Sequence, residues 1–257
     1  MLRSVIFTTK SKSLSGIIDI PGDKSISHRA LIFSSLCYGC SEIFGLLEAD
    51  DVLNTLKSLK KLGVKIVKRK RHYTVFGNGG SFEEPKSALN FGNSGTAARL
   101  ILGLVSTCPI EVHLTGDESL SKRPMKRVVD PLIDFGANFI LEKSEFLPII
   151  VKGSNMPIPI TYEMPIASAQ VKSAIMLSAL NVRGKTKIIE KTNTRDHTER
   201  LMHYLRIKFK KKILSRSSTS IELDGPYEIK PRDITVASDP SSAAFFIVGA
   251  LIIPDSM

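Results

Sequence analysis

The residues of this sequence best suited to chemistry gather in a polar cluster at residues 22–29, directly before an apolar run. Lys24, Ser25 and Arg29 give this cluster a point positive charge, a hydroxyl and a planar guanidinium. A guanidinium matches the geometry of phosphate and carboxylate groups, and the free N–H groups of a helix start favour anions as well. The cluster therefore predicts an anion-binding helix start.

Three further polar clusters repeat this arrangement, at residues 92–96, 168–170 and 238–242. Aligning one serine from each cluster, at positions 25, 94, 168 and 241, gives steps of 69, 74 and 73 residues. The second cluster contains Asn93 and Gly95, and glycine allows a ligand to approach backbone N–H groups. The third contains Ser168, Ala169 and Gln170, whose uncharged polar groups suit the hydroxyls of a sugar-like ring. Several such sites in one domain predict a substrate with two or more acidic groups.

The elements that must position these clusters also repeat. Each cluster precedes an apolar helix, and the first three are followed by a strand, an amphipathic helix and a hairpin that closes at a glycine. The predicted apolar helices are 30–36, 97–104, 171–180 and 243–251, the strands are 41–44, 110–114 and 185–189, the second helices are 51–62, 125–135 and 197–206, and the glycines are Gly77, Gly153 and Gly225. Arg123 and Arg195 lie in loops just before second helices.

The repeat predicts an α/β fold built from βαβαββ units, provided that a strand precedes each cluster. Residues 15–20 permit such a strand before the first cluster. Three complete units and the start of a fourth then account for the chain. Units that each bury one face pack their helices inside and leave their sheets outside. One irregularity is Arg206, which stands where the other units have a glycine after the second helix.

Composition is typical of an ordinary globular protein. The 257 residues are 42% hydrophobic, with a mean hydropathy of +0.05. No apolar run approaches the roughly 18 residues of a membrane helix, and the first residues lack the apolar core of a secretory signal. We therefore expect a cytoplasmic protein that does not associate with membranes.

The net charge of +11 allows two interpretations. It can attract anions, including nucleic acid, or it can reflect solvated lysine-rich faces. The basic runs 65–71 and 208–212 fall where exposed hairpins are predicted, which favours solvated faces. Tryptophan is absent and no aromatic pattern suits base stacking, so nucleic-acid binding stays only as an alternative.

The cysteines and histidines predict no metal and no redox cofactor. Cys37 and Cys40 have the spacing of a redox pair but end a helix rather than opening one, so no helix N-terminus lowers their pKa. We expect ordinary reduced thiols. His28 and His197 could act as general bases, but a structural hydrogen bond is the favoured interpretation.

The clusters together resemble one family, the 5-enolpyruvylshikimate-3-phosphate (EPSP) synthases, in its class II form. The segments that carry the resemblance follow in family order: 21–29, 92–96, 116–125, 168–174, 195–199 and 239–246. The resemblance implies transfer of the enolpyruvyl group of phosphoenolpyruvate to the 5-hydroxyl of shikimate 3-phosphate, with release of phosphate. It also implies a monomer that needs no cofactor.

The resemblance assigns roles to the predicted site residues. Lys24 would contact both substrates, and Ser25 and Arg29 would bind shikimate 3-phosphate. Phosphoenolpyruvate would be held by Asn93, Gly95 and Arg123. The remaining contacts to shikimate 3-phosphate would come from Ser168, Ala169, Gln170 and either Thr194 or Arg195.

The resemblance also implies a second domain of similar design. Residues 21–236 would form the complete first domain, and residues 1–20 and 237–257 would belong to the second, so the chain is expected to be truncated. The acidic residues that serve as acid and base in the family would then be missing, and this form would be inactive alone. The alternatives are a non-catalytic domain that binds shikimate 3-phosphate and a basic module that binds nucleic acid.

Overall fold

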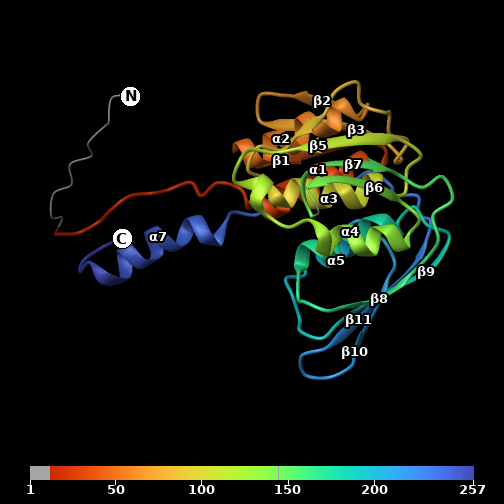
Figure 1. The fold of residues 1–257 in the computed structure, drawn as a ribbon. Coiled ribbons are helices and arrows are strands. Elements are labelled where there is room, and N and C mark those ends of the chain that lie inside the picture. The colour runs from red at the N-terminus through yellow and green to blue at the C-terminus, as the bar shows by residue number, and fades with distance from the viewer. Residues whose placement is uncertain (1–11, 144) are drawn as a thin grey trace.

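Three four-stranded sheets enclose a set of helices in the computed structural model, which describes residues 12–143 and 145–257 (Figure 1). The first sheet contains β1 (Tyr38–Phe44), β2 (Lys65–Lys68), β3 (His72–Asn78) and β12 (Ile234–Thr235). The second contains β4 (Leu89–Asn90), β5 (Glu111–Thr115), β6 (Asn138–Lys143) and β7 (Phe146–Lys152), and the third β8 (Thr161–Met164), β9 (Gly184–Glu190), β10 (Lys210–Ile213) and β11 (Thr219–Gly225). The predicted α/β class is confirmed.

All three sheets share one topology. Their strand orders are β12-β1-β3-β2, β4-β5-β7-β6 and β8-β9-β11-β10. In each sheet the first strand of the order given, β12, β4 or β8, is parallel to its neighbour, and the remaining pairs are antiparallel. The predicted βαβαββ order is therefore confirmed along the chain in the second and third units, and the first sheet has the same topology.

The first unit takes its edge strand from the far end of the repeat. We expected residues 15–20 to form that strand, and this expectation is wrong, because residues 12–20 contain neither strand nor helix. β12 occupies the position instead, with Ile43 paired to Ile234. The segment after the third unit thus completes the sheet of the first unit.

The inner helices are α1 (Lys24–Ser35), α3 (Gly95–Val105) and α5 (Ala169–Ala179). They begin earlier than predicted, so the polar clusters form their first turns rather than loops before them. The reason is capping: the side chains of Asp23, Ser94 and Ser168 accept hydrogen bonds from backbone N–H groups of the first turn. The predicted second helices are confirmed as α2 (Asp50–Lys61), α4 (Lys126–Asp134) and α6 (His197–Tyr204), and a short 3-10 helix, η1, spans Leu120–Lys122.

The turn after each second helix needs a left-handed backbone. Gly63 and Gly136 supply it with φ of 87° and 99°, whereas the third unit places Arg206 there with φ of 61°. A non-glycine residue in this conformation costs roughly 1–2 kcal/mol. The turn geometry is therefore kept in the third unit despite an unfavourable residue.

The glycines that close the hairpins lie against the carboxyl ends of the inner helices. A Cβ atom at Gly225 would lie 2.5 Å from the carbonyl oxygen of Ala179 and 2.6 Å from that of Val182. Gly77 and Gly153 make the same approach to α1 and α3, even more closely. A side chain at these positions would overlap backbone atoms, which explains the repeated glycine.

The two lysine-rich runs form the exposed hairpins that the sequence predicts. One continues from β2 toward β3, and the other forms β10, whose four residues are all exposed. Much of the positive charge is therefore solvated and lies on the outer strands.

The last helix, α7 (Pro240–Ile252), lies beside residues 12–20, apart from the three sheets (Figure 1). The N–H of Gly16 donates to Met257 O at 3.0 Å, and the N–H of Met257 donates to Leu14 O at 2.8 Å. None of the residues of α7 is buried. Within 12–143 and 145–257, no helix has the length and apolar character needed to cross a membrane.

Candidate active site at the start of the inner helices

The amino ends of α1, α3 and α5 are joined to one another by side chains. Gln170 Nε2 donates to Thr96 Oγ1 at 2.9 Å, which links α5 to α3. Arg29 Nη2 donates to Ser173 Oγ at 2.8 Å, which links α1 to α5. Three of the predicted clusters therefore meet at one end of the helical core, as an anion-binding site requires.

Arg29 is nearly enclosed, with 4% of its surface exposed. Besides Ser173, it donates to Thr198 Oγ1 at 2.7 Å and to Ser25 O at 2.9 Å. A guanidinium has five N–H donors, so these three bonds leave two. Burial lowers the pKa of Arg29 to about 10, which still leaves it charged at neutral pH. Arg29 thus joins three helices and keeps donors for a ligand.

Lys24 and Ser25 lie on the first turn of α1. Lys24 is exposed and its Nζ lies 2.9 Å from Asp51 Oδ2 of α2, while Ser25 is half-buried. An exposed ion pair of this kind contributes little to stability, so Lys24 can exchange its partner for an anionic ligand. Its position favours binding rather than a structural role.

The second cluster holds Arg123 in place. Arg123 Nη1 donates to Asn93 O at 3.3 Å, and its Nη2 donates to Asn93 Oδ1 and, at 3.2 Å, to Ser119 Oγ. Asn93 Nδ2 in turn donates to Asp117 Oδ2 at 3.0 Å. The pKa of Asp117 is lowered by hydrogen bonds from the Leu120 N–H and from Asn93, so it stays ionised. These bonds hold the loop before α4 against the start of α3.

Arg99 is a site residue that the sequence analysis missed. It donates to Gly95 O at 3.2 Å, Gln170 Oε1 at 3.1 Å and Pro124 O at 3.0 Å. Its pKa is lowered by burial and by the positive charges of Arg123 and Arg127. A Cβ atom at Gly95 would lie 2.6 Å from Arg99 Nη1. Any side chain at this position would therefore displace the guanidinium group.

The third cluster forms the start of α5. Ser168 caps the helix, and Ser168, Ala169 and Gln170 are all half-buried. Ala169 O accepts a hydrogen bond from Ser173 Oγ at 2.6 Å. Because Gln170 also bonds Thr96 and Arg99, its amide group is oriented from both sides.

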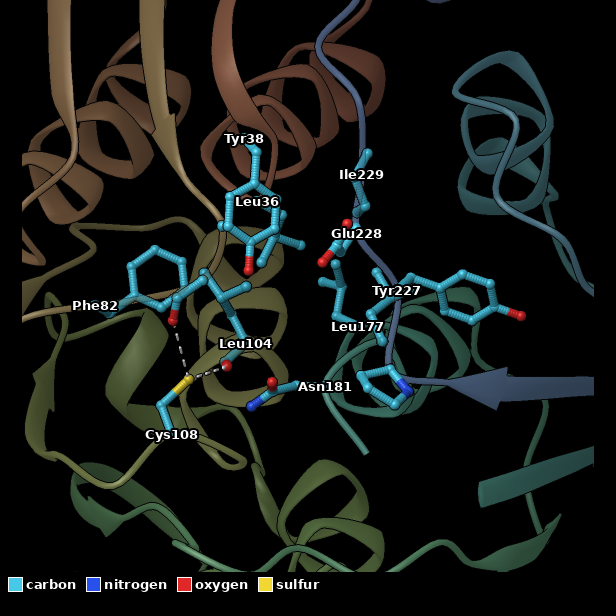
Figure 2. A pocket seen from close by; sticks show the side chains of 14 residues that line it. Leu36, Tyr38, Phe82, Leu104, Cys108, Leu177, Asn181, Tyr227, Glu228 and Ile229 are labelled. Atoms are coloured by element: carbon cyan, nitrogen blue, oxygen red, sulfur yellow. Dashed lines mark hydrogen bonds between the residues drawn. The ribbon is translucent and has the colours of Figure 1, made fainter. Parts of the chain in front are cut away.

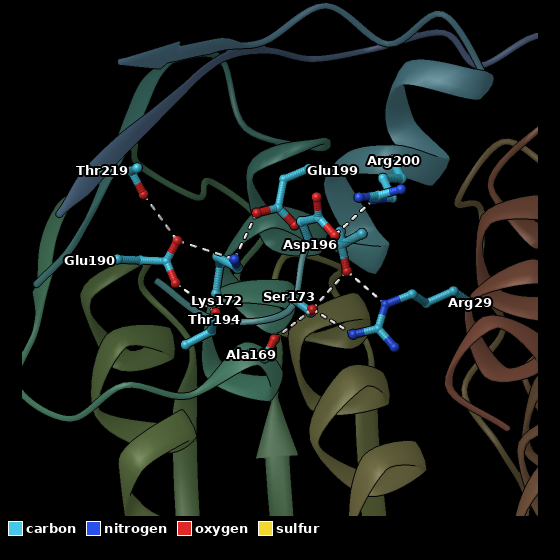
Figure 3. Close-up of polar contacts among 11 residues, drawn as sticks. Arg29, Ala169, Lys172, Ser173, Glu190, Thr194, Asp196, Glu199, Arg200 and Thr219 are labelled. Carbon is cyan, nitrogen blue, oxygen red and sulfur yellow. Dashed lines mark hydrogen bonds and ion pairs between the residues drawn. The ribbon is translucent and has the colours of Figure 1, made fainter. Parts of the chain in front are cut away.

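A buried charge network fixes the loop before α6 (Figure 3). Lys172 is 0% exposed, and its Nζ lies 3.1 Å from Glu190 Oε2 and 2.6 Å from Glu199 Oε1. Thr194 Oγ1 donates to Glu190 Oε1 at 2.6 Å. Thr194 is therefore turned toward the network, whereas Arg195 lies exposed on the neighbouring position. Of the two candidates for a phosphate contact, this arrangement favours Arg195.

The histidines and cysteines behave as structural groups. His28 is fully buried, its Nδ1 lies 2.7 Å from Thr55 Oγ1, and burial lowers its pKa to about 4. The pKa of His197 is also lowered, by burial and then by the charge of Arg29. Burial raises the pKa of Cys37 and of Cys108 to about 11, so both remain protonated thiols.

The residues that the sequence analysis missed share one signal. Arg99 follows Gly95 by one helical turn, and Lys172 interrupts the apolar run after the third cluster. A charged residue one turn into an otherwise apolar inner helix indicates a partner inside the protein, either polar, as for Arg99, or ionic, as for Lys172. The partner itself, Glu190 or Glu199, could not be chosen from spacing.

Comparison with known proteins identifies the family. The family model for EPSP synthase (3-phosphoshikimate 1-carboxyvinyltransferase) matches residues 8–257. A 3-phosphoshikimate 1-carboxyvinyltransferase of Parvibaculum lavamentivorans is 48% identical over 251 residues, covering 96% of this chain and 55% of that relative. The corresponding protein of Paramagnetospirillum magneticum is 46% identical over 258 residues, covering 100% of this chain and 58% of that relative.

A solved structure shows the same fold. The structure of EPSP synthase from Acinetobacter baumannii superimposes with a TM-score of 0.86 at 39% identity, covering 95% of this chain and 54% of that one. The chain thus spans about half the length of the relatives that it matches. With a family match over nearly its whole length, this chain belongs to the EPSP synthase family.

Proposed function

We propose that this chain binds shikimate 3-phosphate and phosphoenolpyruvate for enolpyruvyl transfer between them. The observation that carries the proposal is the convergence of three capped helix starts with four cationic side chains at one end of the core, those of Lys24, Arg29, Arg99 and Arg123. Two substrates that each carry a phosphate and a carboxylate need such a concentration of donors and positive charge.

Each side of the site would take one substrate. Arg29, Ser25, Ser168, Ala169, Gln170 and Arg195 would face shikimate 3-phosphate, with Thr194 supporting Arg195 from the buried network. Asn93, Gly95 and Arg123 would face phosphoenolpyruvate. Lys24 would reach both, because it stands on the first turn of α1 with a carboxylate partner that it can release.

The reaction depends on position and charge. The 5-hydroxyl of shikimate 3-phosphate adds to C2 of phosphoenolpyruvate as C3 is protonated, and the tetrahedral intermediate then loses phosphate. Preorganised cations stabilise the charge that develops on the phosphate, and they hold the reacting atoms in contact. In this chain Lys24 and Arg123 would perform this part of the chemistry.

The organisation of the family would extend to this chain. Residues 21–236 would constitute one domain, and residues 1–20 and 237–257 would belong to a second. We also propose that the protein is cytoplasmic and monomeric. It would not bind nucleic acid, because the lysine-rich runs form solvated hairpins rather than a basic surface at the clustered helix starts.

Calorimetry of the whole chain tests the proposal. Shikimate 3-phosphate should bind, and shikimate, which lacks the phosphate, should bind at least about tenfold more weakly because the charge-assisted hydrogen bonds are lost. Lys24→Ala should weaken shikimate 3-phosphate binding by a similar factor. Lys68→Ala is the matched control, because Lys68 is also an exposed lysine paired to a carboxylate, Glu48, at 2.6 Å.

Two results would contradict the proposal. One is the absence of heat with shikimate 3-phosphate at millimolar concentration. The other is equal weakening by Lys24→Ala and Lys68→Ala, which would show only a general charge effect. Tight, salt-dependent binding to single-stranded or duplex DNA would instead favour the nucleic-acid alternative.

A further inference from the structure

A cavity of about 300 Å³ lies at the opposite end of the inner helices from the proposed active site. All three units contribute to it: the first through Leu36 and Tyr38, the second through Leu104 and Cys108, and the third through Asn181 and the segment 226–229. Leu36, Cys108 and Asn181 directly follow or lie just beyond the carboxyl ends of α1, α3 and α5. The cavity therefore lies where these three helix ends meet.

Each polar side chain that the argument uses at this cavity can accept a hydrogen bond, and one of them, Glu228, is a carboxylate. Figure 2 shows the Glu228 carboxylate and the Tyr38 hydroxyl directed to the space beside Leu36. Asn181 Nδ2 donates to Thr107 O at 2.6 Å, which leaves the amide oxygen as an acceptor and one amide N–H. Helix carboxyl ends add partial negative charge from their carbonyl groups.

Among residues 12–143 and 145–257, no basic side chain lines this cavity. The residues that line the cavity include one carboxylate and no lysine, arginine or histidine, in a protein whose net charge is +11. Cys108 donates its thiol to Leu104 O at 3.4 Å and to Gly80 O at 3.8 Å. The Cys108 thiol therefore donates to backbone carbonyl groups of the protein and not into the cavity.

The remaining walls are apolar or aromatic. Leu36, Phe82, Leu104 and Leu177 surround the space, and the ring of Tyr227 points away from it because its hydroxyl donates to Lys208 O (Figure 2). Apolar walls with a few polar groups at one side are the usual composition of a small-molecule site. The volume lies at the lower limit of such sites, which restricts the ligand to a small one.

We propose that this cavity binds a small organic cation, a primary amine with an aromatic or apolar body. The ammonium group lies between the Glu228 carboxylate, the Tyr38 hydroxyl and the carboxyl ends of the helices, and the body packs against Leu104 and Leu177. The site is separate from the proposed substrate site, because it lies at the other end of α1, α3 and α5. The inference does not depend on the proposed enzymatic function.

Calorimetry and protein-observed NMR with 2-phenylethylamine test the proposal on the whole chain. Two probes of similar size isolate the charge: 2-phenylethanol is neutral, and phenylacetate is negative. The amine should bind at least about tenfold more tightly than the alcohol, and phenylacetate should not bind, since a charge-assisted hydrogen bond exceeds a neutral one by about that factor. Resonances of residues 108 and 181 should shift with the amine.

Two variants locate the site. Glu228 is exposed, so Glu228→Gln should fold normally and weaken amine binding about tenfold. Glu222→Gln is the matched control, because Glu222 lies on β11 and does not line the cavity. Equal affinity for the three probes, no binding of the amine at millimolar concentration, or equal affinity of both variants would each overturn the proposal.

Discussion

The two ends of the inner helices are held together by different means. At the amino ends, charged and polar side chains make the connections, as in the bonds from Arg29 to Ser173 and from Gln170 to Thr96. At the carboxyl ends, the backbone of Gly77, Gly153 and Gly225 lies against the end of the inner helix of the same unit, and neutral side chains link the helices, as in the bond from Asn181 to Thr107 O. The amino ends depend on charged and polar side chains, and the carboxyl ends on close packing and neutral hydrogen bonds.

The two ends also differ in how much their residues vary from one unit to the next. The glycine at the carboxyl end occurs in all three units with the same contact, whereas the three amino ends carry different residues: Lys24 and Arg29, Asn93 and Gly95, and Ser168 and Gln170. Packing can be satisfied three times in the same way. Two unlike substrates, in contrast, need a different set of groups from each unit, so the differing end is the one suited to specific binding.

The strongest test of the comparison is Lys172→Met, which removes the cation from the network at the amino end. It leaves Glu190 and Glu199 buried without their shared partner, and breaking a buried pair in this way costs about 3–5 kcal/mol of unfolding free energy. Urea denaturation of the variant and the unmodified chain would measure the difference.

An exposed ion pair provides the matched control for this variant. Lys191 lies 2.8 Å from Glu163, and both side chains are more than half exposed. Lys191→Met should therefore change the unfolding free energy by less than about 1 kcal/mol. If Lys172→Met were equally mild, charge would not be what holds the amino end together.

Close packing at the carboxyl end is tested by Gly153→Ala. The new methyl group would overlap the carbonyl oxygens of Val105 and Cys108, which are backbone atoms that cannot rotate away. Overpacking of this kind should lower the unfolding free energy by about 1–3 kcal/mol, measured in the same urea titration.

Gly249→Ala is the control for the added methyl group. Gly249 lies inside α7, where a Cβ atom would meet, among the described residues, Leu14 Cδ1 at 3.2 Å. We expect no loss of stability there, because alanine is a better helix former than glycine. A Gly153→Ala protein as stable as this control would show that the helix ends do not pack as tightly as the comparison requires.

Much of this architecture could be predicted from the sequence, because local patterns encode it. The spacing of the polar clusters predicted the three units, and the closing glycines predicted where the hairpins end. The edge strand of the first unit could not be predicted, since β12 is two residues long and lies after the third unit, far from β1 in the sequence. Helix starts were placed too late because capping by Asp23 extends α1 over the polar residues.

The site was predictable to a lesser degree. Residues that face a ligand stood out by their motifs, whereas Arg99 and Lys172, which orient other residues, did not. Their partners lie far away in sequence, as with Arg99 and Gln170, and only the packing of α3 against α5 brings them together. Long-range pairing of this kind leaves no local pattern from which the partner can be identified.

The last prediction concerns the pH dependence of stability at the amino ends of the inner helices. Burial lowers the pKa of His28 from 6.5 to about 4; Asp51 opposes the shift, and Arg29 and Lys24 reinforce it. The unfolded chain therefore binds a proton at His28 more readily than the folded one. Stability from this group is fully present above about pH 6.5 and is lost as the pH falls toward 4, by about 2 kcal/mol between about pH 7 and 5.

His28→Gln isolates this contribution, because glutamine does not titrate and can still bond Thr55. Its unfolding free energy should fall less steeply over that interval than that of the unmodified chain, by about 2 kcal/mol. His203→Gln, on the exposed face of α6, should retain the full slope. Identical slopes for the unmodified chain and His28→Gln would show that the amino end admits water to His28, and its side-chain connections would then be looser than the backbone contacts at the other end.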